Sequence, residues 1–151
     1  MTTIIQGNDL RRILFGTAVS KSTGTLAATT ISLFTVAGGM VVVTSIIGRV
    51  TTAITVANSY KLQHNPTTGT TTDLVAATDI GTTDTPAGNL LGFTGVKADS
   101  IITGPGSAPT LAKPLILTEG VIESVSAGTD GVIVWTLTYV PLDDSASVVA
   151  A

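Results

Sequence analysis

The side chains that could perform chemistry are few in this chain, and His64 is the first to consider. It is the single histidine among 151 residues, and the chain contains no cysteine. A catalytic histidine requires a nucleophile and an orienting acid within hydrogen-bond reach, and the neighbouring Gln63, Asn65 and Pro66 supply neither. A lone histidine without cysteines also lacks the partners of a transition-metal site. The pattern therefore predicts a structural residue at the end of a strand, before a proline turn.

The acidic residues are spread too widely to form a catalytic or metal-binding cluster. Asp73, Asp79 and Asp84 are six and five residues apart, which is not the tight alternation of a calcium-binding loop. Glu119 and Glu123 would share one face of a strand. Four residues span roughly 13 Å at the rise of a strand, so these two carboxylates are too far apart to share a proton. We expect solvated carboxylates, with no metal ion and no cofactor.

Motifs for phosphate binding or nucleophilic catalysis are also missing from the sequence. It contains neither a GxxxxGK[ST] loop nor a GxSxG elbow. Trp135 and Tyr139 could stack on a sugar or a base if they were exposed, but their aliphatic neighbours favour burial. The pair Asp143 and Asp144 is most simply a solubilising feature beside the end of the chain. The sequence therefore predicts a protein that is not an enzyme.

The composition instead indicates a surface that other proteins cover. Charged residues make up 11% of the chain, against about 25% in an ordinary soluble domain. Threonine occurs 28 times, and this β-branched polar residue keeps a pleated surface wettable without charge. A free monomer usually stays soluble through many interspersed charges. We therefore expect a homo-oligomer or a larger assembly.

Charge and hydropathy also bear on two other classes of partner. The net charge is −3, and only Arg11 and Arg12 are adjacent basic residues, so the sequence has no basic footprint for nucleic acid. Mean hydropathy is +0.53, but the most apolar stretch, Leu33–Val56, is interrupted by glycine, threonine and Arg49. The N-terminal residues do not follow the order of a signal peptide. We expect a soluble protein that binds neither nucleic acid nor membrane.

The first thirty residues differ from the rest and predict an extended arm. Asp9–Phe15 predicts a helical turn or two, with Asn8 or Asp9 as N-cap and Gly16 as terminator. Residues 17–30 are small and polar and offer no face that would bury in a core. The arm is either a frayed terminus or a segment that orders against a partner. In the second case, the contacts would come from Ile4, Ile5, Arg11, Arg12, Ile13, Leu14 and Phe15.

Residues 31–142 predict a β-domain, followed by a tail at 143–151. Strands are predicted at 31–37, 40–57, 59–66, 89–96, 100–104 and in two runs within 115–142. Gly38 and Gly39 predict a hairpin-type turn, and Gly48 is a natural place for a bulge or a bend between two sheets. Residues 72–80 are compatible with a short strand or a helical turn. In the strand at 59–66, one side would carry Tyr60, Leu62 and His64.

The last third of the chain shows the clearest pattern. A second hairpin is predicted at 127–131, where glycine can supply a positive φ. The strand after it would turn one large face to the core, made of Ile133, Trp135, Leu137 and Tyr139. About eight short strands separated by turn signals indicate an all-β protein, a β-sandwich or barrel of jelly-roll-like form, with the extended N-terminal arm.

Two segments carry a resemblance to a known class of proteins. They are LFTVAGGMVVVTSIIGRVTTAI, residues 33–54, and WTLTYVPLDDSASVVA, residues 135–150, which together make up about a quarter of the chain. Both resemble small structural proteins of tailed-bacteriophage virions. The resemblance implies a non-enzymatic capsid decoration (cement) protein or another head accessory protein. Such a protein would sit on the outside of the virion as a homotrimer, bind the major capsid protein and stabilise the head, after synthesis in the host cytoplasm.

Two alternatives remain open at this point. A receptor- or glycan-binding module of a head or tail fibre would use the loops at 65–73 and 79–89, but these loops contain no aromatic residue. A tail-tube or connector subunit would share the β-rich composition. It would form rings rather than shell-bound trimers, so the symmetry of the particle separates it from a decoration protein.

Overall fold

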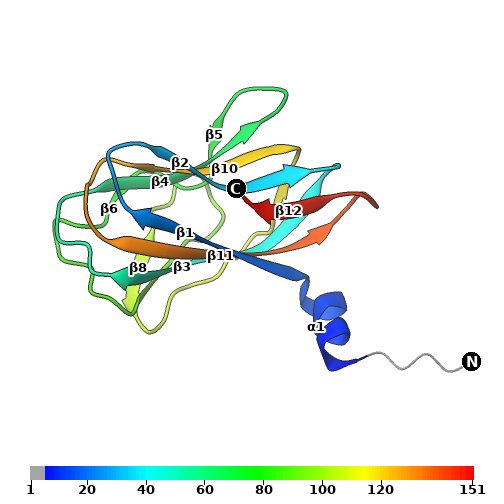
Figure 1. The fold of residues 1–151 in the computed structure, drawn as a ribbon, viewed down its shortest axis with the longest axis horizontal. Helices are drawn as coiled ribbons and strands as arrows, with labels where there is room; N and C mark the ends of the chain where they lie inside the picture. The colour runs from blue at the N-terminus through cyan, green and yellow to red at the C-terminus, as the bar shows by residue number, and fades with distance from the viewer. Residues whose placement is uncertain (1–5) are drawn as a thin grey trace, which may run out of the picture.

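The computed structural model describes residues 6–151, which form one short helix and two antiparallel β-sheets (Figure 1). The helix is α1 (Gly7–Phe15). The first sheet contains β1 (Thr17–Thr25), β3 (Val41–Thr52), β7 (Asn89–Gly92), β8 (Ile102–Pro105), β9 (Leu115–Leu117) and β11 (Val132–Pro141). The second sheet contains β2 (Thr30–Ala37), β4 (Ser59–Pro66), β5 (Thr72–Asp73), β6 (Thr78–Asp79), β10 (Gly120–Ser126) and β12 (Ser147–Ala150).

The chain passes back and forth between the two sheets. The order in the first sheet is β1-β11-β3-β7-β8, with β9 also paired to β3. The order in the second is β12-β2-β10-β4-β5, with β6 also paired to β4. From β1 to β4, and again from β10 to β12, consecutive strands lie in opposite sheets, as in a double-sheet jelly roll. The prediction of an all-β sandwich of jelly-roll-like form is confirmed.

The core lies between the sheets, and its centre joins β11 to β4. The predicted inner face of β11 is confirmed, because Ile133, Trp135, Leu137 and Tyr139 are all buried. The rings of Trp135 and Tyr60 stack with centroids 6.1 Å apart, and the indole N–H donates to the Tyr60 hydroxyl at 2.8 Å. The prediction that Tyr60, Leu62 and His64 share one side of β4 is confirmed, and this side faces the core, since all three are buried.

Gly48 does not mark a bulge or a bend, as the sequence had suggested. It pairs in register with Trp135, and the register shifts between β3 and β11 lie on either side of it. A Cβ atom at this position would lie 3.1 Å from the indole ring of Trp135. The glycine therefore makes room for a large side chain of the neighbouring strand, which the local pattern of β3 does not reveal.

Both predicted hairpins are wrong, because each turn joins strands of different sheets. Gly38 and Gly39 connect β2 to β3, and residues 127–131 connect β10 to β11. The first turn packs on the segment before β12, where the Asp143 carboxylate accepts a hydrogen bond from the Met40 N–H at 2.7 Å. The positive φ expected in the second turn occurs at Gly131 but not at Gly128, and Gly38 and Gly39 also have positive φ. The same turn residues therefore occur at a hairpin or at a corner between sheets.

The predicted arm is shorter in the structure than residues 1–30. Residues 17–25 form β1, which pairs with β11 from Thr17 opposite Tyr139 to Thr25 opposite Val132. An edge strand needs backbone pairing more than large side chains, and here Val19 is half-buried and Thr23 is buried. The tail also contributes a strand, since β12 pairs with β2. Ile4 and Ile5 lie outside the described residues.

Within residues 6–151, no helix has the length and apolar character needed to cross a membrane.

Candidate assembly surface

Helix α1 is short and leaves the sandwich directly at β1. It begins at Gly7 after the N-cap residue Gln6, two or three residues earlier than the predicted caps, and Gln6 forms no side-chain cap. Asp9 in the first turn and Arg12 in the last turn suit the helix dipole. The predicted terminator Gly16 is confirmed: its φ is 90° and its N–H donates to the Arg12 carbonyl oxygen.

The position of Gly16 holds the root of the helix against β11. A Cβ atom at Gly16 would lie within van der Waals overlap of the Tyr139 carbonyl oxygen, so only glycine fits this close approach. A shallow groove at this junction is lined by Asp9, Arg12, Ile13, Thr17 and Pro141. Beyond that junction α1 stands away from the sandwich (Figure 1).

The helix exposes an unusual amount of apolar surface for its length. Leu10 is 47% exposed, and Ile13, Leu14 and Phe15 are 64–68% exposed. The sequence prediction named Ile13, Leu14 and Phe15, together with Arg11 and Arg12, and the structure brings all five onto this exposed helix. Leu10 was missed, although its spacing of four residues from Leu14 places the two on one helical face.

A second exposed apolar cluster lies at the end of the sandwich from which α1 projects, and we call it the end patch. Val42 pairs with Val140 on one side and with Ile116 on the other. The pairing continues to Leu142, whose N–H donates to the Met40 carbonyl oxygen at 2.9 Å. Residues two apart along a strand share a face, so these side chains form two adjacent rows. The end patch consists of Met40, Val42, Ile116, Val140 and Leu142.

The surroundings of the end patch are acidic. Glu119 and Met40 line one shallow groove, together with residues 67, 68 and 118. Asp143 and Asp144 follow Leu142 directly and are exposed. The segments that build the end patch, 38–42, 116–119 and 140–144, contain these three carboxylates and neither lysine nor arginine.

The end patch continues into an outer face of the first sheet that is almost free of charge. We call this surface the first outer face; its central rows are Ser22–Val134–Arg49, Ser20–Thr136–Ile47 and Ala18–Thr138–Ser45. Small and β-branched side chains dominate these rows, and Arg49 is their one ionised group. The Ser20 and Thr136 hydroxyls share a hydrogen bond of 2.8 Å.

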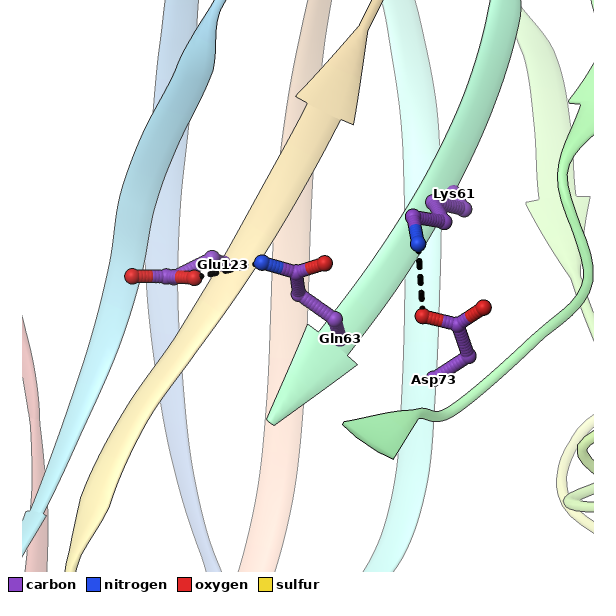
Figure 2. A network of polar contacts seen from close by, with 4 residues as sticks. All are labelled: Lys61, Gln63, Asp73 and Glu123. Carbon is purple, nitrogen blue, oxygen red and sulfur yellow. Dashed lines mark hydrogen bonds and ion pairs between the residues drawn. The ribbon is translucent and has the colours of Figure 1, made fainter. Parts of the chain in front are cut away.

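The outer face of the second sheet, the second outer face, is built differently. Lys61 pairs with Asp73 at 2.7 Å, and the Gln63 amide donates to the Glu123 carboxylate at 2.7 Å (Figure 2). Asn65 also donates to Glu123, at 3.3 Å. Glu123 was expected to be a solvated carboxylate and instead belongs to this network. Glu119 lies before β10 rather than in it, so the two carboxylates do not share a strand.

The other side chains that were considered for chemistry have structural surroundings. His64 lies between the sheets, its Nε2 atom has no hydrogen-bond partner within residues 6–151, and burial lowers its pKa. Asp79 is exposed but accepts hydrogen bonds from the N–H groups of Asn58, Gly81 and Thr82. Hydrogen bonds from the Thr82 hydroxyl and these N–H groups hold its pKa well below the ordinary range.

Asp130 plays a similar part at the corner between β10 and β11. It accepts from the Thr55 hydroxyl at 2.7 Å, from the Thr55 N–H at 2.8 Å and from the Val56 N–H at 3.3 Å. These bonds, led by that of the Thr55 hydroxyl, lower the pKa of its carboxyl group.

Within residues 6–151, no three potential metal ligands lie together. What this arrangement offers is surface for binding, at α1 and the end patch.

Comparison with protein-family models, curated proteins and solved structures finds no match to this chain.

Proposed function

We propose that the chain is a non-enzymatic structural subunit of a virion, a capsid decoration protein that binds the outside of a phage head and stabilises it. The observation that carries this proposal is the exposed apolar helix α1, joined to a sandwich whose first outer face bears a single ionised group. Large exposed apolar patches mark interaction sites, because the exposure of apolar surface to water is energetically unfavourable. The major capsid protein and further copies of the chain are the partners.

The length of α1 supports the same conclusion. A nine-residue helix is below the 12–15 residues at which an isolated helix becomes stable in water. Tertiary packing normally supplies the remaining stability, yet most of the apolar side chains of α1 are not buried in this chain. Burial against a partner contributes roughly 25 cal/mol per Å² of apolar surface, and many copies on one shell add their contacts through multivalency.

The aromatic residues weigh against a glycan-binding module. Among residues 6–151, Phe15 on α1 is the exposed aromatic residue; the other five are buried, and the loops at 65–73 and 79–89 contain none. A sugar-binding surface usually offers an exposed ring on which the sugar can stack. The jelly-roll arrangement itself does not separate the two functions, since it serves both capsid and lectin domains.

The experiment compares the full chain with a variant that lacks residues 1–15. This deletion stops before β1, so the sheet keeps its edge strand. Both proteins are mixed with phage heads assembled without the native protein, and binding is measured by co-sedimentation and electron microscopy. We expect the full chain to bind in ordered positions on the outer surface, and the variant to lose at least about tenfold in affinity, or about 1.4 kcal/mol. Undiminished binding of the variant would remove the arm from the mechanism, and no binding of the full chain would refute the function.

A further inference from the structure

We propose that the end patch of one copy is the binding site for helix α1 of a second copy, which names one partner in the assembly and so rests on the proposed function. Both surfaces are apolar, both are exposed, and both lie at the same end of the molecule. Each copy would place its helix α1 on the end patch of one neighbour and receive the helix of another neighbour on its own end patch. The contact between copies would therefore be head-to-tail. Such contacts close into a ring when the rotation between copies permits it.

The helix has one side that is turned away from its own sandwich. Asp9, Arg12 and Ile13 line the shallow groove at Pro141, so this side of α1 is the one nearest the body, although Ile13 is still 68% exposed. At 100° per residue, the opposite side carries Leu10, Arg11, Leu14 and Phe15. We call these four residues the outer stripe. The outer stripe places three apolar side chains around the guanidinium group of Arg11. It is therefore complementary to an apolar surface with acidic residues at its margin.

The end patch has that composition. Two rows of aliphatic side chains form it, and its margin holds Glu119, Asp143 and Asp144. Within residues 6–151, the one ion pair joins Lys61 and Asp73, so in this range neither Arg11 nor Arg12 forms an ion pair with an acidic side chain. Complementary charge at the margin of an apolar contact orients the two partners and suppresses wrong ones.

The geometry at Gly16 favours a second copy over the chain's own patch. Only this residue separates α1 from β1, and its backbone is packed against the Tyr139 carbonyl. For the outer stripe to reach the patch of its own chain, α1 would have to rotate about Gly16 and break that contact. A neighbouring copy can instead approach the outer stripe where it already points.

The experiment measures self-association of the purified full chain, without any phage head, by sedimentation velocity over a range of concentrations. Two variants each remove one half of the contact: Leu14→Glu in the outer stripe and Ile116→Glu in the end patch. Each should raise the dissociation constant about 30-fold or more, as for a central interface residue. Val149→Glu is the matched control, since Val149 is an exposed apolar residue on the short strand β12, 53% exposed against 65% for Ile116.

Mixing the two variants gives the sharper test. The Ile116→Glu chain keeps an intact helix and the Leu14→Glu chain keeps an intact patch, so the mixture can form one good contact per pair. We expect heterodimers in the mixture, where neither variant alone associates. A chain that is monomeric at about 100 μM overturns the proposal, as does assembly that survives Ile116→Glu or a mixture that stays monomeric. Fluorescence of the buried Trp135 verifies that each variant is folded. Binding to heads is a separate measurement, so this proposal and the proposed function can fail independently.

Discussion

The two outer faces of the sandwich differ in how they meet their surroundings. The second outer face carries the Lys61–Asp73 ion pair and the amide–carboxylate bonds of Glu123, which suit a surface in water. The first outer face presents small and β-branched side chains with Arg49 as its one charge in the central rows. Since one chain and one fold produce both, the difference is not a requirement of folding. Under the proposed function, the difference is expected because the two faces would have different neighbours.

The inner faces differ in the same sense. Strands β3 and β11 turn only aliphatic and aromatic side chains and Gly48 to the core. Strands β4 and β10 bury His64, Ser124 and Ser126 as well. The second sheet, whose outer face is charged, therefore also has the more polar inner face, although Thr23 of β1 is buried in the first sheet. Four experiments test this comparison, and they follow from the largest expected effect to the smallest.

The largest effect is expected in the core that both sheets share. Replacement Trp135→Ala should reduce the free energy of unfolding by about 3–5 kcal/mol, because it leaves a cavity and takes the indole donor from Tyr60. Denaturant unfolding measures it. Trp135→Phe, which keeps a ring but loses the N–H, should cost clearly less. Equal losses for the two variants would mean that packing around the ring contributes little.

The next effect compares the two outer faces directly. Val134→Glu and Val125→Glu place the same charge on half-buried positions of the central strands β11 and β10. Arg49 lies opposite Val134 and Lys61 lies opposite Val125, so each new carboxylate has a cation nearby. We expect Val134→Glu to weaken assembly or head binding by about tenfold, or about 1.4 kcal/mol, and Val125→Glu to change it less than about twofold. Similar losses of binding for the two variants would contradict the proposed difference between the two outer faces.

The third effect concerns acid sensitivity, which we assign to the second sheet. Burial lowers the pKa of His64, so the unfolded chain binds a proton more readily than the folded protein. The contribution of neutral, buried His64 to the free energy of unfolding is therefore fully present above the ordinary histidine pKa. It is lost as the pH falls below that value. In His64→Gln, the fall in melting temperature between pH 7.5 and pH 5.5 should be smaller than in the wild type. The lowered pKa values of Asp79 and Asp130 act in more acidic solution, where their carboxyl groups gain protons.

The smallest effect is expected from the ion pair on the second outer face. A double-mutant cycle with Lys61→Ala and Asp73→Ala should give a coupling of about 0.2–1 kcal/mol, because both side chains are partly exposed. The coupling should shrink as salt is added. A larger coupling energy that does not depend on salt would show that this surface is more rigid than a solvated face. It would also reduce the difference between the second and the first outer face.

Much of the fold could be predicted from local patterns. Alternation of side chains identified the inner face of β11 and grouped Tyr60, Leu62 and His64 on one side of β4, since residues two apart on a strand point the same way. The scarcity of charge predicted a surface with unusual neighbours, and the glycine after Phe15 marked the end of α1. In the candidate site, the exposed residues of α1 were recognised from their types, except for Leu10.

The partners of the strands were decided only by the tertiary structure. Turn residues specify a local φ and ψ but not the sheet in which the next strand pairs, so the corners at Gly38–Gly39 and 127–131 were predicted as hairpins. Strand β1 has few large side chains and is held by backbone bonds to β11, which side-chain patterns do not report. The end patch exists because three segments distant in sequence meet beside β3. Side-chain periodicity is a local property, whereas pairing and adjacency depend on the whole chain.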